Sequence, residues 1–328
     1  MSITRRRFAA GTAAVAAAAI IARPARAQTV IRWGELLPTT HPQVQMLDRI
    51  AKEVKEKSSG RIEVQSFPNG QLGSGRDMTE AVASGALTFT TDGAAALGQF
   101  LPQLSVIEAP YLWRDAAHMA KVGGSPIFEG LNKDLVAKRG MRMLAVTYYG
   151  KRHLTSGSKQ IRTVGDMAGF KLRVPPVDTF RAMAEAWGAR ATPVNFNELY
   201  LALSQGAVDG QENPLPTIQS AKLNEVQKFL VLTGHIITPR LVIANDEFLK
   251  KLSDADRSIL MTAIKNGAAW QDKELADQEG QLTDTLRKAG MTVIEPDVES
   301  FRKPVLEKVP AQFESKWGKG TWDKLLAL

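Results

Sequence analysis

The sequence predicts an α/β protein with largely parallel β-sheets. Short apolar segments bounded by Gly, Pro or Asn alternate along the chain with amphipathic segments of helical periodicity, an order typical of this class. The chain has 328 residues, of which 44% are hydrophobic and 23% charged. This composition indicates an ordinary globular protein with a sizeable core, in one large or two ordinary domains.

The predicted elements follow one another in that alternating order. We expect strands at residues 29–33, 61–65, 141–147, 170–174 and 241–244. Apolar residues at helical spacing from Val44 to Val54 predict a helix that ends before Ser58. Phe180, Met183 and Trp187 predict a second helix, whose apolar stripe we interpret as core rather than as an aromatic ligand cage.

A much longer helix is predicted near the C-terminus. Ser253 and Asp256 have the spacing of a capping box, and the polar helical pattern that follows extends to about Lys288. At 1.5 Å per residue this helix spans roughly 50 Å, which is too long for one compact domain and long enough to brace two.

The N-terminus has the features of a bacterial export signal. The sequence TRRRF at residues 4–8 precedes a short apolar stretch at 9–22, and ARA at 25–27 matches a signal-peptidase site. The paired arginines favour the twin-arginine route. An amphipathic helix or membrane anchor is the alternative. We therefore expect residues 1–27 to be a twin-arginine signal peptide and the mature protein to lie in the periplasm.

Charge and motifs exclude several classes of function. The net charge of +8 falls to +3 without the five arginines of residues 1–27, and the remaining cations are scattered among acids, so we expect no nucleic-acid partner. The chain has no cysteine, and its four histidines lack metal-ligand spacing. Complete dinucleotide, P-loop and G-x-S-x-G motifs are also missing, which lowers the prior for an enzyme.

One charged residue stands out because of where it lies. Arg173 interrupts an apolar strand that ends at Pro175, so its guanidinium should emerge at the carboxyl end of that strand, where α/β sheets bind ligands. A planar cationic fork suits bidentate binding of a carboxylate. The alternative is an ordinary ion pair with a neighbouring Asp or Glu.

Seven segments decide between these alternatives, because together they resemble a known family. They are GRIEV (60–64), PxGQLG (68–73), APYL (109–112), LRVP (172–175), FxExYxAL (196–203), DGQENP (209–214) and EVQKF (225–229). From about residue 32 to the C-terminus the chain resembles the solute-binding proteins of tripartite ATP-independent periplasmic (TRAP) transporters, of the dicarboxylate and sialic-acid type.

The resemblance implies a two-lobed periplasmic binding protein fold, type II-like, with the long helix bracing both lobes. Lobe I would comprise residues 28–150 and about 239–278, and lobe II residues 151–238 and about 279–328. The strand pattern breaks near residues 149–152 and 236–239, where we expect the hinges. The lobes would close on a small organic acid and deliver it to TRAP permease membrane subunits. No cofactor, metal or catalytic residue is implied, and a monomer is expected.

The resemblance also assigns site residues. It implies that Arg173 binds the substrate carboxylate, helped by Arg152 and Asn213, and that Phe196 packs against the ligand. Tyr149 is a further candidate at the expected hinge.

Two departures from the sialic-acid binders concern the rest of the ligand. Those proteins carry an acid at the position of Gly93 and an asparagine at that of Glu35, so sialate is not expected here. Glu35 and Asp92 would instead accept hydrogen bonds from hydroxyl or amine groups. A sugar acid or hydroxy acid is the expected ligand, with simple dicarboxylates as the alternative. An exported α/β enzyme acting on a sugar or hydroxy acid, or a binding module that feeds a sensor, are the alternative functions.

Overall fold

The computed structural model describes residues 28–328, so the predicted signal peptide lies outside the described residues. Its β-strands are β1 (Thr29–Gly34), β2 (Ile62–Phe67), β3 (Phe89–Gly93), β4 (Met141–Ser156), β5 (Lys171–Val174), β6 (Arg190–Pro193), β7 (Gly210–Pro214), β8 (Phe229–Asn245) and β9 (Thr292–Ile294). The α-helices are α1 (Pro42–Lys57), α2 (Gly75–Ser84), α3 (Ala94–Leu97), α4 (Ala116–Ala120), α5 (Pro126–Arg139), α6 (Asp178–Ala186), α7 (Phe196–Ser204), α8 (Leu215–Ser220), α9 (Asp246–Lys251), α10 (Asp254–Lys288), α11 (Val298–Trp317) and α12 (Thr321–Leu326). Four 3₁₀ helices complete the described chain: η1 (Pro102–Glu108), η2 (Lys121–Gly124), η3 (Val164–Met167) and η4 (Leu223–Glu225).

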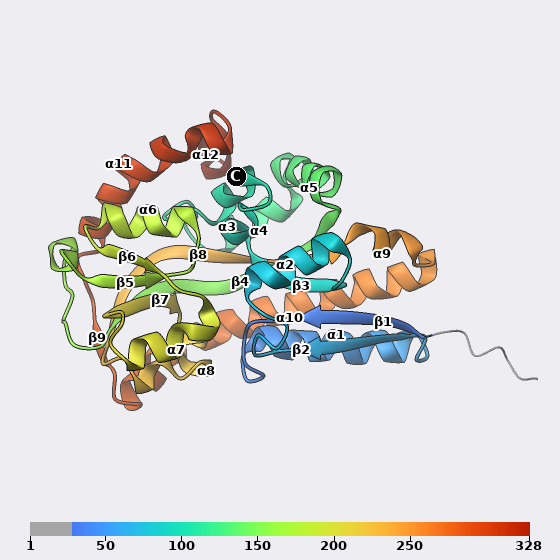
Figure 1. Cartoon of the computed structure of the whole chain (residues 1–328), viewed down its shortest axis with the longest axis horizontal. Helices are drawn as coiled ribbons and strands as arrows, with labels where there is room; N and C mark the ends of the chain where they lie inside the picture. Colours follow the sequence, from blue (N-terminus) through green and yellow to red (C-terminus); the bar gives the residue numbers. More distant parts are fainter. Residues whose placement is uncertain (1–27) are drawn as a thin grey trace, which may run out of the picture.

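The described strands form one sheet with two halves (Figure 1). Their order is β2-β1-β3-β8-β4-β7-β5-β6, and β9 adds to β8. One half holds β1, β2 and β3, the other β5, β6, β7 and β9, and the long strands β4 and β8 run through both. This is the expected α/β architecture with two lobes.

The sheet is mixed, and the prediction of a largely parallel sheet was wrong at its centre. β1 pairs in parallel with β2 and β3, and β5 pairs in parallel with β6 and β7. In contrast, β8 runs antiparallel to both β3 and β4. A chain that enters lobe II along β4 and returns to lobe I along its neighbour β8 must reverse direction. The two strands that connect the lobes are therefore antiparallel.

The pairing of β4 with β8 is irregular in the middle. Its register shifts between Tyr148 and Gly150 and again between Arg152 and Leu154. Gly150 has φ of 119°, a left-handed conformation that side chains other than glycine rarely adopt. The irregularity coincides with the hinge segment expected at residues 149–152.

Helix α10 connects the two halves of the molecule, as predicted. It has 35 residues, and the side chain of its N-cap, Ser253, accepts a hydrogen bond from the backbone of Asp256. Near its start Leu260 and Ile264 join the core around β1, β2 and α1, and near its end Leu282 and Leu286 join the core around α7 and α8. Figure 1 shows it extending from one half of the molecule to the other.

The C-terminal helices also contact both halves. On one side, the carbonyl of Phe301 in α11 accepts a hydrogen bond from the indole nitrogen of Trp187, which follows α6. On the other, the indole nitrogen of Trp317 in α11 donates to Ser105 of η1. The predicted residue boundaries of the lobes stay a prediction. Among residues 28–328, no helix is both long and apolar enough to cross a membrane.

Candidate functional site

A cavity of about 90 Å³ lies between the two lobes, where β3, β4, β5, β7 and β8 approach one another. Six of the seven residues predicted to bind substrate line it: Asp92, Tyr149, Arg152, Arg173, Phe196 and Asn213. The seventh, Glu35, is not among the lining residues. The cavity is also lined by residues that were not predicted to bind substrate, of which Arg240 and Glu108 are charged and Phe180 is aromatic.

Arg173 is a buried cation without an acidic partner. It projects from the short apolar strand β5 and is only 2% exposed. Its Nε and Nη2 donate to the carbonyl oxygen of Val194, at 2.9 and 2.7 Å. No carboxylate of residues 28–328 forms an ion pair with it, which contradicts the alternative of an ordinary ion pair. Burial lowers the pKa of Arg173 to about 10, because the more distant charge of Glu212 offsets only part of the cost of taking the guanidinium out of water.

Arg152, by contrast, is already neutralised. Its Nε and Nη2 donate to both carboxylate oxygens of Glu212, at 2.5 and 2.8 Å, and the guanidinium lies 5.1 Å from the centre of the Phe180 ring. Burial disfavours both charges, but the attraction of Glu212 still raises the pKa of Arg152. The antiparallel pairing of β4 with β7 brings these side chains together. Arg152 therefore brings no uncompensated charge to the cavity.

The pair of Arg152 and Glu212 extends to two further residues. The Nη2 of Arg152 also donates to the amide oxygen of Asn213, at 3.1 Å, and so orients that amide at the cavity wall. The Nε2 of His235 lies 3.0 Å from Glu212, and its Nδ1 lies 2.8 Å from the hydroxyl of Thr233. Burial lowers the pKa of His235, so the ring is neutral and fits as a donor to Glu212 and an acceptor from Thr233.

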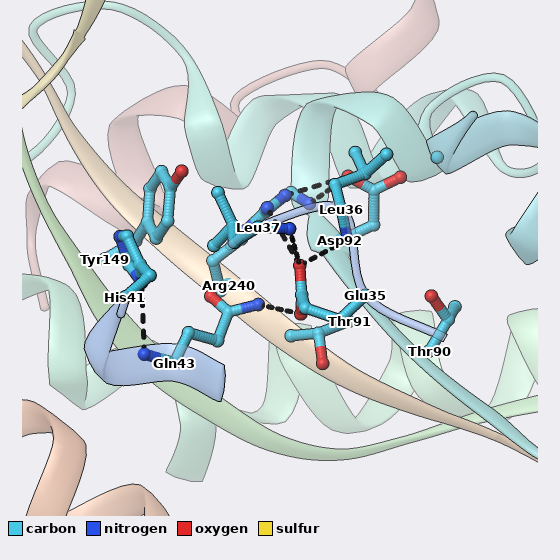
Figure 2. Close-up of polar contacts among 12 residues, drawn as sticks. Glu35, Leu36, Leu37, His41, Gln43, Thr90, Thr91, Asp92, Tyr149 and Arg240 are labelled. Carbon is cyan, nitrogen blue, oxygen red and sulfur yellow. Dashed lines mark hydrogen bonds and ion pairs between the residues drawn. The ribbon is translucent and has the colours of Figure 1, made fainter. Parts of the chain in front are cut away.

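The lobe I side of the cavity is built around Arg240. This residue interrupts the apolar strand β8 in the same manner as Arg173 interrupts β5, a pattern that could have identified it from the sequence. Its Nη1 donates to Asp92 at 3.0 Å, and it lies 4.5 Å from the centre of the Tyr149 ring (Figure 2). Asp92 lines the cavity as predicted, but one of its oxygens is engaged by Arg240 and by the backbone of Gly93.

Glu35 has a different role from the one predicted. Its carboxylate is fully buried and accepts hydrogen bonds from the backbone nitrogens of Leu36 and Leu37, at 2.8 and 3.3 Å, and from the side chain of Gln43 (Figure 2). These contacts turn it back into its own loop, because the backbone donors that follow β1 need an acceptor. Glu35 therefore positions Leu36 and Leu37, which line the cavity, and does not face the ligand space itself.

Aromatic residues close the remaining wall. The Tyr149 hydroxyl accepts a hydrogen bond from Thr217 at 2.7 Å, and its ring stacks on that of His41 with centroids 5.3 Å apart. Phe196 is half-buried at the first turn of α7, and Phe180 lies on α6. Phe180 was predicted as core; it is buried and it also lines the cavity.

The sequence did not identify Glu108 as a cavity residue. It lies at the end of the 3₁₀ helix η1, and no periodic sequence pattern predicts this helix. It is 4% exposed and lines the cavity. In the part of the chain that the structure describes, no group of three or more His, Cys, Asp or Glu side chains could hold a metal ion.

Comparisons with known proteins agree with this geometry. Residues 33–316 match the family model of the bacterial extracellular solute-binding proteins, family 7. A solute-binding protein of Verminephrobacter eiseniae is 35% identical over 92% of this chain and 90% of its own length. The sialic acid-binding periplasmic protein SiaP of Vibrio cholerae is 32% identical, over 92% and 94% respectively.

A solved structure is similar over nearly the whole described chain. It is a TRAP periplasmic solute-binding protein from Polaromonas with bound D-erythronate, 34% identical, with a TM-score of 0.87 over 92% of this chain and 99% of that one. Proteins of this family bind solutes and are not enzymes, so the alternative of an exported enzyme is set aside. The chain belongs to the bacterial extracellular solute-binding proteins, family 7.

Proposed function

We propose that this protein captures a small organic acid in the cavity between its lobes, with the acid's carboxylate on Arg173, and delivers it to the membrane subunits of a TRAP permease. The observation that carries this proposal is that Arg173 is buried in the cavity wall and forms no ion pair among residues 28–328. A buried guanidinium is costly unless an anion pairs with it, and a carboxylate matches its planar donors. The Nη1 of Arg173 takes part in no hydrogen bond among the described residues, so it is free for such a contact.

Lobe closure would be the step that encloses the acid. The lobes already contact each other beside the cavity: the side chain of Gln99 donates to the carbonyl of Pro176 at 3.1 Å, and that of Asn197 to the carbonyl of Gly73 at 3.4 Å. The irregular centre of the β4–β8 pair supplies a place to bend. A ligand favours closure only as far as it binds the closed form better, and contacts from both lobes provide that difference.

The relatives favour an organic acid as the solute. The Vibrio cholerae relative is named for sialic acid, and the Polaromonas structure holds D-erythronate. All seven residues singled out from the sequence belong to this proposal, six as the cavity wall and Glu35 as the support of its loop. Export of the chain to the periplasm by the twin-arginine route, and action as a monomer, are part of the same proposal.

Thermal unfolding of Arg173→Ala with and without acids tests the proposal. A panel of D-erythronate, L-galactonate, pantoate, succinate and malate should contain acids that raise the Tm of the unaltered protein, and the Arg173→Ala variant should lose that increase. Arg190→Ala is the matched control, since Arg190 is an exposed arginine of the same lobe outside the cavity. An undiminished increase in Arg173→Ala would contradict the assignment.

A further inference from the structure

Glu108 is the counterpart of Arg173 on the lobe I side of the cavity. Its Oε2 accepts a hydrogen bond from the backbone nitrogen of Ala95 at 2.9 Å, and no hydrogen bond among residues 28–328 engages its Oε1. No lysine or arginine of the described chain lies within ion-pair distance. Glu108 is therefore a buried carboxyl group in the cavity wall that lacks a cationic partner, as Arg173 is a buried cation that lacks an anionic one.

The two residues line the cavity from different lobes. Glu108 ends η1 and accepts a hydrogen bond from Ala95, close to Gly93 at the end of β3, whereas Arg173 lies on β5. A ligand whose carboxylate lies on Arg173 would thus present its other end to Glu108.

Gly93 is what allows Glu108 to reach the cavity. A Cβ atom at position 93 would lie 2.4 Å from Oε2 of Glu108 and 3.0 Å from its Oε1, so the carboxyl group would have to shift away from its present place. The backbone of Gly93 has φ of −70°, a conformation open to any residue, so the close approach and not backbone strain explains the glycine. The glycine and the glutamate form one structural unit.

We propose that Glu108 is a specificity-determining residue that binds a hydroxyl group of the ligand, at the end remote from the carboxylate, and so selects hydroxylated monocarboxylates over dicarboxylates. This inference rests on the proposed function. A carboxyl group can accept a hydrogen bond from a hydroxyl whether or not it is ionised.

A second ligand carboxylate would meet an unfavourable environment at this end. The cations that act on Glu108 are Arg152 and Arg240. Arg152 is paired with Glu212, and Arg240 is paired with Asp92 at 3.0 Å and lies 3.9 Å from Glu35. With Glu108 added, acidic groups outnumber basic ones there. Repulsion and desolvation therefore disfavour the binding of succinate and similar acids, whereas a neutral hydroxyl can donate a hydrogen bond to Glu108.

Calorimetric titration with matched acids tests the inference. D-erythronate and butanoate share a four-carbon chain and one carboxylate but differ in their hydroxyls, and succinate adds a second carboxylate. The unaltered protein should bind D-erythronate more tightly than both of the others. Glu108→Ala should weaken D-erythronate binding ~10- to 100-fold and leave butanoate unchanged, the effect of losing a hydrogen bond to a carboxylate. Glu129→Gln, which alters an exposed acid of lobe I, is the control.

Gly93→Ala gives a second test that does not depend on one substitution. In the unaltered protein the added methyl group should displace the Glu108 carboxyl and weaken D-erythronate binding, whereas in a Glu108→Ala background it should have little further effect. Additive effects of the two substitutions would contradict the proposed unit of Gly93 and Glu108.

The outcomes separate this inference from the function on which it rests. If D-erythronate binding requires Arg173 but is unaffected by Glu108→Ala, or if succinate binds as tightly as D-erythronate, the role of Glu108 is overturned while the carboxylate site stands. If no acid of the two panels binds, or if binding does not require Arg173, the proposed function fails and the inference fails with it.

Discussion

The two lobes furnish their sides of the cavity in different ways. On the lobe II side, one arginine, Arg152, forms a bidentate ion pair with Glu212, and a second, Arg173, donates to the Val194 carbonyl but has no acidic partner among the described residues. On the lobe I side, Arg240 is held by Asp92, and the free group is the carboxyl of Glu108. Each side thus combines a satisfied pair, which fixes the geometry, with one unsatisfied group of opposite sign. We therefore expect the ligand to bind at the two groups without an ion-pair partner, Arg173 and Glu108.

Neutralising Glu212 should have the largest effect on the free energy of unfolding. Glu212→Gln leaves Arg152 as a buried charge without its partner, so we expect a loss of about 3–5 kcal/mol in the free energy of unfolding. Chemical denaturation without ligand measures it. Glu108→Gln is the same chemical change on the other side of the cavity and should cost far less. Equal losses from the two substitutions would show that the distinction between paired and unpaired groups is mistaken.

The dependence of stability on pH tests the unpaired group of lobe I, the carboxyl of Glu108. Burial raises the pKa of Glu108 from 4.5 to about 7, against the opposing effects of Ala95, Arg152 and Arg240 and in the same direction as Asp92. Between these values the unfolded chain gives up the proton and the folded protein keeps it. Stability should therefore fall as pH rises through this window and level off above pH 7, by about 3 kcal/mol at 1.36 kcal/mol per pKa unit.

Denaturation of the ligand-free protein between pH 4.5 and 8, compared with Glu108→Gln, isolates this contribution. The difference in stability between the two proteins should shift in favour of the variant as pH rises. A difference that is constant across this range would mean that Glu108 is ionised throughout in the folded protein.

Removing a contact between the lobes should have the smallest effect, and it should act on ligand affinity. Gln99→Ala removes the hydrogen bond to the carbonyl of Pro176 and with it part of the closed form's advantage. One such bond contributes about 0.5–1.5 kcal/mol, so ligand affinity should drop roughly two- to tenfold while stability without ligand stays the same. Gln45→Ala, which removes a glutamine–carbonyl bond within lobe I, serves as the control for the titration. Equal affinities of these two variants would indicate that this contact does not distinguish closed from open.

The sequence predicted the outer elements of the fold better than the two long central strands, β4 and β8. Strand β1, helices α1 and α10 and the α/β class follow from local periodicity and capping, and those elements are found as expected. The lengths of β4 and β8 were underestimated, because the strand pattern breaks near residues 149–152 and 236–239. In the structure both strands continue past these residues through shifts of register, which pairing between distant segments stabilises.

For the site, the sequence indicated residues that line the cavity where a side chain's place follows from its strand. Arg173 is recognisable as a charge inside an apolar strand, and Arg240 shows the same pattern. Glu35 could not be placed in this way, because the direction of its side chain depends on the backbone donors of Leu36 and Leu37. The Glu108 carboxyl group occupies space that a Cβ atom at position 93 would take, a relation between distant residues that no spacing rule contains.

A crystal structure of the complex with D-erythronate tests the central claim most directly. The account predicts the ligand carboxylate within hydrogen-bond distance of the guanidinium of Arg173, and a ligand hydroxyl at the same distance from Oε1 of Glu108. The reverse orientation, with the carboxylate on Arg240 and no ligand atom in contact with Arg173, would contradict it.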